Sequence, residues 1–172
     1  MTRGALRALG LGAAFAVFVL DQLVKWIVVG PLDLINLGSI HLLPFFDLRF
    51  TRNYGVSLGM FTASSAEMRF GLVAVTALIA SGVLVWLWLE RARWDVFGLG
   101  LVLGGALGNI RDRLTVGFVI DYADFHIGEW RPFLIFNLAD VAITIGVLIL
   151  LARSLLSREK PASGNPVPTE TN

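Results

Sequence analysis

The sequence predicts an α-helical integral membrane protein with four transmembrane helices and a small β-rich piece outside the membrane. The first observation is composition: of 172 residues, 56% are apolar and 16% are charged, with a mean hydropathy of +0.74. A water-soluble domain of this length carries a larger share of polar residues. The second observation is that apolar runs of about the length that crosses a bilayer recur along the chain.

The four expected spans lie at about residues 8–30, 68–89, 96–110 and 133–151. The first is interpreted as a retained helix and not as a cleaved signal peptide, because polar residues interrupt its C-terminal half and further spans follow. Together the spans form a single membrane domain over residues 1–153. The remaining residues, 154–172, are polar and contain several prolines, so a disordered tail is expected there.

The segment between the first two spans, residues 31–66, is expected to form the β-rich piece. Proline, glycine and polar residues interrupt its short apolar runs. One run, Leu48-Arg49-Phe50-Thr51, alternates apolar and polar residues as a strand does. If the chain crosses the membrane four times, the connection at residues 111–132 lies on the same side as this segment.

Basic residues near the span ends predict the orientation. Lysine and arginine are enriched in the cytoplasmic loops of membrane proteins. With four spans, one side of the membrane receives Arg3, Arg7, Arg91, Arg93, Arg153, Arg158 and Lys160. That side is expected to be cytoplasmic and to hold both termini, so residues 31–66 and 111–132 face outward.

Composition also argues against several classes of function. The chain has no cysteine, so it can form neither a disulfide, nor a thiol nucleophile, nor a cysteine-ligated metal site. The net charge is +1, and no basic patch interleaved with aromatic residues is present. Nucleic acid is therefore not an expected partner.

Two aspartates at the edges of apolar segments are the strongest functional signal. Asp121 follows an apolar run, and Asp140 lies 19 residues later in the first turns of the fourth span. Ionisable side chains at membrane depth are costly, which makes them a functional hypothesis by default. Two carboxylates that meet share one proton and supply an acid and a base at one pH. Such a pair can activate water for peptide hydrolysis without a covalent intermediate.

Neighbouring polar residues have a structural interpretation beside a functional one. Asp21 and Lys25 stand four residues apart on one helical face, either as an ion pair at the membrane edge or as a support for the site. For Asp112, a structural salt bridge with Arg113 is the favoured interpretation. Asp124 is interpreted as a solvated loop residue.

The carboxamides also have two interpretations. Asn109 and Asn137 either hold the aspartates in place or satisfy backbone groups at the ends of the spans. A set of oxygen ligands for a hard cation is a further alternative, but the spacing of these residues and the aspartates matches no calcium loop. No metal and no cofactor are expected.

A serine nucleophile is a weaker alternative. Gly55-Val56-Ser57-Leu58-Gly59 matches the G-x-S-x-G pattern of serine hydrolases. That pattern requires a strand–turn–helix context and a histidine base. The only histidines are His41 and His126, and neither has an evident orienting partner in the sequence.

Two other functional classes remain as alternatives. A small proton-coupled transporter also uses intramembrane carboxylates, but such proteins commonly have internal repeats or broken helices in both halves. The polar motifs of this chain differ from one another and gather at one membrane face. A non-catalytic chaperone or assembly factor would keep its function when Asp121 or Asp140 is neutralised.

Five short motifs contain most of these polar residues. They are Asp21-Gln22-Leu23-Val24-Lys25, Asn53-Tyr54-Gly55, Gly104-Gly105-Ala106-Leu107-Gly108-Asn109 with Asp112-Arg113, Val119-Ile120-Asp121-Tyr122, and Phe136-Asn137-Leu138-Ala139-Asp140. In this order, over about residues 15–150, the sequence resembles the lipoprotein signal peptidases (signal peptidase II) of bacteria. Any one motif is weak, whereas five in order with four spans are specific.

The resemblance implies an aspartyl endopeptidase of the bacterial inner membrane, with four helices and a small periplasmic β-rich cradle. It implies removal of the signal peptide from diacylglyceryl-modified prolipoproteins by a cut just before the lipidated cysteine, near the periplasmic face. The implied partners are this substrate and membrane lipid, and nothing demands more than a monomer. By motif position, Asp121 and Asp140 resemble the catalytic dyad, and Asp21 and Lys25 a stabilising pair. The supporting or substrate-binding residues are Asn53, Gly55, Asn109, Asp112, Arg113 and Asn137.

One residue departs from the family pattern. Arg111 stands where an apolar residue would be unsurprising, and it adds a charge beside Asp112. The salt-bridge partners of Asp112 and Arg113 are therefore left open by the resemblance.

Overall fold

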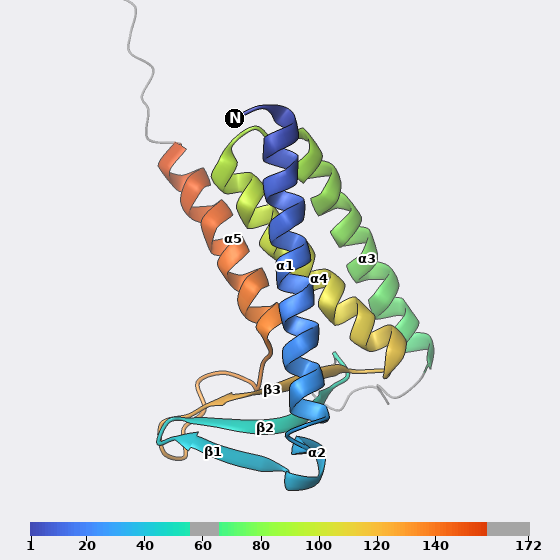
Figure 1. Ribbon diagram of the computed structural model, residues 1–172, viewed down its shortest axis with the longest axis vertical. Coiled ribbons are helices and arrows are strands. Elements are labelled where there is room, and N and C mark those ends of the chain that lie inside the picture. Colours follow the sequence, from blue (N-terminus) through green and yellow to red (C-terminus); the bar gives the residue numbers. More distant parts are fainter. Residues whose placement is uncertain (56–65, 158–172) are drawn as a thin grey trace, which may run out of the picture.

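Four long helices stand side by side with a three-stranded sheet across one end (Figure 1). The computed structural model describes residues 1–55 and 66–157. Ser57 and residues 158–172 of the expected tail lie outside the described residues. The long helices are α1 (Arg3–Val29), α3 (Ala66–Leu89), α4 (Arg93–Thr115) and α5 (Leu138–Ser157).

The helices overlap the four expected spans but differ from them at the ends. The third expected span, at residues 96–110, is the middle of α4, which continues in both directions. The fourth begins five residues later than expected, at Leu138, because Asn137 caps the helix there. Helix α5 also continues to Ser157, so residues 154–157 of the expected tail are helical.

Three of the helices in the described residues, α1, α3 and α5, are long and apolar enough to cross a membrane. Many large apolar side chains on their outer faces are exposed, including Phe15, Leu78 and Leu148. Exposed apolar surface of this extent is unusual on a soluble monomer and is expected where a protein meets lipid. Helix α4 is less apolar and contacts each of the other three long helices.

Glycines allow α4 to lie in the centre of the bundle. A side chain on Gly104 would overlap the backbone oxygen of Ala14 in α1. On the other side, a Cβ atom on Gly105 would lie 2.5 Å from the backbone oxygen of Ala139 in α5. Small residues let membrane helices approach closely, so these glycines bring α1 and α5 against α4 where the polar motifs begin.

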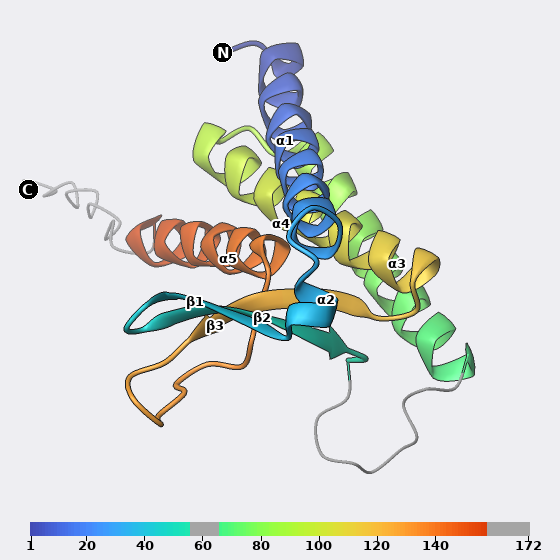
Figure 2. The ribbon, with the colours of Figure 1, turned by 60° about the horizontal axis from the view of Figure 1, so that its bottom comes forward.

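The sheet joins the two segments that were expected to lie on one side of the membrane. Strands β1 (Ser39–Leu43) and β2 (Phe46–Asn53) form a hairpin, and β3 (Val119–Phe125) pairs antiparallel with β2 (Figure 2). A short helix, α2 (Leu34–Leu37), precedes the hairpin. Strand β3 was not predicted, because its two aspartates are residues that strands generally disfavour.

A small apolar core fixes the sheet beneath the bundle. Val28 at the end of α1 and Leu34 of α2 are buried together with Tyr122 and Ala123 of β3. This contact holds β3 against the end of the bundle, so that one face of the strand points at the polar ends of α4 and α5.

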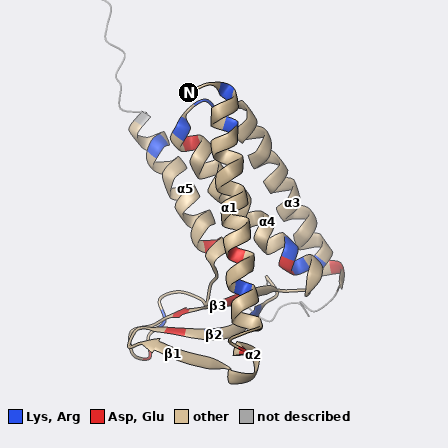
Figure 3. Ribbon diagram, in the orientation of Figure 1, with Lys and Arg blue, Asp and Glu red and all other residues tan. Residues whose placement is uncertain are grey.

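Both described chain ends lie at the end of the bundle that is opposite the sheet (Figure 1). Several Lys and Arg positions lie at that end, and others lie at the lower ends of the helices near the sheet (Figure 3). Arg7 of α1 donates to the backbone oxygen of Trp88 in α3, and Arg153 of α5 pairs with Asp95 of α4 at 3.3 Å. The members of the expected basic set that the structure describes, from Arg3 to Arg153, are therefore at one end of the bundle, and Arg158 and Lys160 lie outside the described residues.

Candidate active site

The two predicted aspartates meet where β3 passes the start of α5. Asn137 connects them: its Nδ2 donates to Asp121 Oδ1 at 2.6 Å, and its backbone N donates to Asp140 Oδ2 at 3.2 Å. Asp121 is 1% exposed and Asn137 is also 1% exposed. The carboxylates come from different elements, so their proximity depends on the docking of the sheet onto the bundle.

Asp140 is held in place by the first turn of α5. Asn137 Oδ1 accepts a hydrogen bond from the backbone N of Asp140 at 3.0 Å, while Asp140 Oδ2 accepts from the backbone N of Asn137. This reciprocal pair is a capping box, in which the N-cap and the third helical residue satisfy each other's N–H groups. The carboxylate of Asp140 thus lies at the positive end of the helix dipole.

Asn109 of α4 supports the second oxygen of Asp140. Its Nδ2 donates to Asp140 Oδ1 at 2.9 Å. Its Oδ1 accepts from Lys25 Nζ and from Asn137 Nδ2, each at 3.3 Å. Two donors on the oxygen determine which way the amide points, and the nitrogen is left facing Asp140.

Asn53 of β2 supports Asp121 from across the sheet. Thr51 pairs with Asp121 in the register of β2 and β3, which leaves Asn53 diagonal to Asp121 on the same face. Asn53 Nδ2 donates to Asp121 Oδ2 at 2.9 Å, and its Oδ1 accepts from the backbone N of Gly55 at 2.8 Å. Gly55 has a φ of 82°, a conformation that favours glycine.

Burial raises the pKa of Asp121 to about 6, and the hydrogen bond from Asn53 opposes that rise. The negative charge of Asp140 raises the pKa of Asp121 further. The carboxyl group therefore keeps its proton to a higher pH than an exposed aspartate does. Because the folded state binds this proton more tightly than the unfolded chain, the group destabilises the fold as the pH rises from about 4 through about 6.

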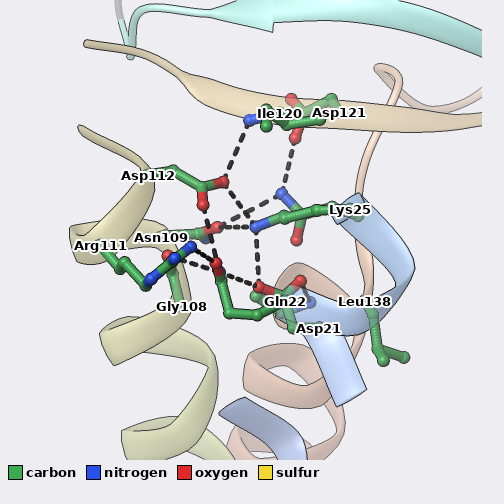
Figure 4. Close-up of polar contacts among 12 residues, drawn as sticks. Asp21, Gln22, Lys25, Gly108, Asn109, Arg111, Asp112, Ile120, Asp121 and Leu138 are labelled. Carbon is green, nitrogen blue, oxygen red and sulfur yellow. Dashed lines mark hydrogen bonds and ion pairs between the residues drawn. The ribbon is translucent and has the colours of Figure 1, made fainter. Parts of the chain in front are cut away.

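A buried ion network joins Asp21 and Lys25 of α1 to Asp112 of α4 (Figure 4). Lys25 Nζ lies 2.8 Å from Asp21 Oδ2 and 2.8 Å from Asp112 Oδ2, and all three side chains are at most 2% exposed. Asp21 Oδ1 also accepts from the backbone N of Ala139 at 3.1 Å. The predicted pair of Asp21 and Lys25 is thus present, and it reaches both α4 and the first turn of α5.

The favoured partner of Asp112 was wrong. Asp112 forms its ion pair with Lys25 and not with Arg113, and it also accepts from the backbone N of Ile120 at 3.2 Å. Consecutive residues of a helix point in different directions, so Asp112 faces α1 while Arg113 does not.

Arg113 lies instead on the side of the dyad and of Gly55. A Cβ atom on Gly55 would be 3.3 Å from Arg113 Nη2. The guanidinium is close enough to interact electrostatically with Asp140 and Asp121, and also with Asp112, with which it forms no ion pair among the described residues. Within the part of the chain that the structure describes, its buried Nε has no hydrogen-bond partner.

Asp124 is not the solvated loop residue that was expected. It is 0% exposed in β3, with Arg131 Nε at 3.2 Å and Arg49 Nη1 at 4.0 Å from its Oδ2. The reason is its place in a strand that sequence patterns did not reveal. Asp124 pairs in register with Asp47, away from Asp140, so it takes no part in the polar cluster around the dyad.

Sequence reasoning missed two further residues of the site. The hydroxyl of Tyr122 accepts from the backbone N of Leu138 at 3.1 Å, and burial raises the pKa of Tyr122, which keeps the hydroxyl protonated. Gln22 Nε2 donates to Asp21 at 3.0 Å and to Asp112 at 3.1 Å. Their positions beside Asp121 and Asp21 within two of the motifs were the available signal.

The two histidines do have a partner. Asp47 of β2 lies 2.9 Å from His41 Nδ1 and 3.3 Å from His126 Nε2. Burial raises the pKa of Asp47, but the hydrogen bonds from the histidines outweigh it, and the net direction is downward. This cluster lies in the sheet, while Ser57, the residue of the serine alternative, lies outside the described residues.

An apolar groove of about 310 Å³ leads from Asp140 along the outside of α5. Asp140 lies in its wall, together with apolar side chains that include Phe133, Phe136, Val141 and Ile145. The site therefore combines paired carboxylates with a neighbouring surface that suits an apolar ligand.

Residues 13–156 match the family model of signal peptidase (SPase) II. The chain belongs to this family. The resemblance noted in the sequence is thus confirmed, and so are the prediction of a protease and the prediction of a multi-span membrane protein. An aspartic type of mechanism is what membership of the signal peptidase II family implies.

Similar proteins agree with this assignment to signal peptidase II. The lipoprotein signal peptidase of Rhizorhabdus wittichii is 57% identical over 153 residues, which is 89% of each chain. That of Sphingopyxis alaskensis is 51% identical over 160 residues, covering 93% of this chain and 92% of the relative.

Two solved structures described as bacterial membrane enzymes, both determined by the in meso method, have the same fold. One has a TM-score of 0.75 at 25% identity, covering 91% of this chain and 93% of its own. The other has a TM-score of 0.71 at 30% identity, covering 85% and 92%. The bundle with its small sheet is therefore the fold of known membrane enzymes.

Proposed function

We propose that this signal peptidase II removes the signal peptide from diacylglyceryl-modified prolipoproteins, cutting just before the lipidated cysteine, with Asp121 and Asp140 as its catalytic dyad. One observation carries the proposal: a single buried residue, Asn137, donates to both carboxylates, from its side-chain amide to Asp121 and from its backbone N to Asp140. Every carboxylate oxygen of the pair accepts at least one N–H group. Such fixed donors preorganise the site for charge that develops during a reaction.

The raised pKa of Asp121 indicates which of the two aspartates is protonated before the reaction begins. Because burial raises the pKa of Asp121 to about 6, Asp121 is assigned the shared proton at the start of the proposed reaction, and Asp140 is assigned the role of base. Asp140 takes a proton from water as the water oxygen bonds to the scissile carbonyl carbon, and Asp121 gives its proton to the carbonyl oxygen. In the second step Asp140 gives its proton to the leaving nitrogen, the C–N bond breaks, and Asp121 recovers a proton from the intermediate.

The surrounding polar residues have distinct proposed roles. Asn53, Asn109 and Asn137 hold the carboxylates in orientation through the bonds described above. Arg113, whose Nε is buried beside the dyad, is suited to bind a backbone carbonyl of the substrate. Gly55 places the chain close to that guanidinium without a side chain in the way.

The apolar groove along α5 is the proposed approach for the lipid-modified part of the substrate. Its walls are apolar, and Asp140 is at its edge. A diacylated substrate arrives laterally from the bilayer, and burial of its hydrocarbon contributes about 0.8 kcal/mol for each CH₂ group. Membrane lipid occupies the same surface when substrate is absent.

The proposed topology has four spans in the bacterial inner membrane. Helix α4 is proposed to cross the membrane as well, together with the three more apolar helices around it. The end of the bundle opposite the sheet is proposed to be cytoplasmic with both termini, because the positive-inside rule favours that side for the short flanks with Arg3, Arg7, Arg91 and Arg93. The dyad and the sheet are then near the periplasmic face, and the protein acts as a monomer without metal or cofactor.

The decisive experiment compares the purified protein with three isosteric variants on a diacylated prolipoprotein under metal-free conditions. Asp121→Asn and Asp140→Asn remove an ionisable proton while keeping the side-chain shape. Asp124→Asn is the matched control, because it changes a buried aspartate of the same strand away from the dyad.

We expect the wild type and Asp124→Asn to cut before the lipidated cysteine. Asp121→Asn and Asp140→Asn should lose activity by at least about a thousandfold. Retained cleavage in both dyad variants contradicts the two-aspartate mechanism. Absence of cleavage by the wild type contradicts the substrate assignment, and a proton current from the reconstituted protein then favours the transporter.

A further inference from the structure

A second pocket lies on the other side of the polar network, between α1, α4 and the start of β3. Its volume is about 480 Å³, within the range of ligand-binding sites. Neither Asp121 nor Asp140 lines it, and it shares no lining residue with the groove along α5. The proposed reaction therefore leaves this pocket unassigned.

The inner wall of the pocket is polar, but its charged side chains are already paired with each other. Lys25 and Asp112 line it, and their charges are paired with each other at 2.8 Å. Gln22, the third polar residue of this wall, donates to Asp21 and Asp112. Buried ions that are paired in this way do not attract a further ion.

The rim of the pocket has a positive charge, that of Arg111, which no described carboxylate pairs with. Arg111 is exposed, and among the described residues it forms no ion pair; its guanidinium donates to the neutral side-chain oxygen of Gln22 (Figure 4). The adjacent carboxylate of Asp112 is directed at Lys25. Arg111 is also the residue that departs from the family pattern, so the dyad mechanism gives it no role.

The rest of the rim is apolar and faces away from the protein. Leu23 and Trp26 lie three residues apart on α1, on one helical face, and are 46% and 63% exposed. Val116, across the pocket at the end of α4, is 47% exposed. Tryptophan is enriched where a membrane helix meets the headgroup region, which places this rim at the boundary of the bilayer.

We propose that this pocket binds an anionic phospholipid, with the phosphate on Arg111 and an acyl chain along Leu23 and Trp26. The charge of the rim is complementary to a phosphate, and arginine binds phosphate through several N–H groups at once. The exposed apolar residues extend from the same opening into the bilayer, where a soluble anion would leave them uncovered. A phospholipid has a phosphate for Arg111 and an acyl chain that covers the exposed apolar residues of the rim.

Lipid binding by the purified, full-length protein in a neutral detergent tests the proposal. Phosphatidylglycerol, phosphatidylcholine with the same acyl chains, and inorganic phosphate are added separately, and bound lipid is counted by native mass spectrometry beside the Tm. The variants are Arg111→Gln, Arg111→Lys and Trp26→Ala. Arg91→Gln is the matched control, because Arg91 is an exposed arginine at the opposite end of the bundle.

The wild type is expected to retain phosphatidylglycerol about tenfold better than phosphatidylcholine, the contribution of one charge-assisted hydrogen bond. Arg111→Gln removes this preference, Arg111→Lys restores part of it, and Trp26→Ala weakens the retention of both lipids. Arg91→Gln behaves as the wild type. An unchanged preference in Arg111→Gln overturns the proposal.

Two further outcomes also overturn it. Inorganic phosphate that raises the Tm as much as phosphatidylglycerol, and displaces it, indicates a site for a free anion. A higher KM of Arg111→Gln for prolipoprotein in phosphatidylcholine vesicles indicates that the substrate occupies the pocket. The proposal does not depend on the dyad, because lipid binding is measured without cleavage.

Discussion

Removal of the Asn53 side chain is expected to move the pH dependence of cleavage to higher pH. Asn53 Nδ2 donates to Asp121 Oδ2 at 2.9 Å, and this hydrogen bond lowers the pKa of Asp121. Without it, only the hydrogen bond from Asn137 and the charge of Lys25 still oppose the effects of burial and of the Asp140 charge on that carboxyl group. Asp121 then keeps its proton to a higher pH, and so does the active, singly protonated dyad.

The size of the shift follows from the energy of one hydrogen bond. A hydrogen bond to a charged group contributes about 1.5–3 kcal/mol, and one pKa unit corresponds to about 1.4 kcal/mol. Asn53 is only half-buried, so water replaces part of the lost bond. We therefore expect Asn53→Ala to raise the pKa of Asp121 from about 6 by about one unit.

The assay is kcat/KM for a diacylated substrate, measured from about pH 4 to about pH 9, where the basic limb reports the higher pKa of the dyad. Asn53→Asp is the matched variant: it keeps an oxygen for the backbone N of Gly55, removes the donor, and adds a negative charge. It should move the basic limb further than Asn53→Ala. A basic limb that stays in place, or that moves to lower pH, refutes the reasoning.

Three other predictions concern stability. Lys25→Met leaves two buried carboxylates without their cation, and should lower the free energy of unfolding by about 3–5 kcal/mol, as measured by denaturant titration in detergent; a loss below about 1 kcal/mol contradicts the network. Gly108→Ala should lower the Tm because its Cβ atom would lie 2.6 Å from Asp21 Oδ2, whereas Gly82→Ala meets open space and should leave the Tm unchanged or raise it slightly; equal effects of the two substitutions exclude this explanation. Because the pKa of Asp121 is raised to about 6, wild-type stability relative to Asp121→Asn should increase as the pH falls from about 7 to about 4. Calorimetry at several pH values measures that difference, and a decrease toward acid pH contradicts the assigned direction.

The long helices were largely predictable because the bilayer imposes a simple length and composition on each span. Helix geometry also makes contacts between residues three or four apart readable from the sequence. Asp21 and Lys25, four residues apart, do form their ion pair, and the Asn137-to-Asp140 spacing is that of a capping box.

The third strand and the contacts it makes were not predictable in the same way. Two aspartates within seven residues obscure the pattern of β3, and its pairing with β2 joins segments about 70 residues apart. For this reason Asp124, expected in a loop, is buried in the sheet. Asn53 was identified by its motif, but its bond to Asp121 depends on the register of the two strands.

The sequence by itself determined the membrane setting, the helices, the local pairs and the set of polar residues at one end of the bundle, because each depends on composition or on contacts within one helical turn. Only the tertiary structure decided which of those residues meet. Asn137 links Asp121 to Asp140. Asp112 pairs with Lys25 and not with Arg113. Arg111 lies on the rim of a separate pocket. Such contacts join residues distant in the chain, so they follow from how helices and strands dock and from the cost of leaving a buried charge unpaired.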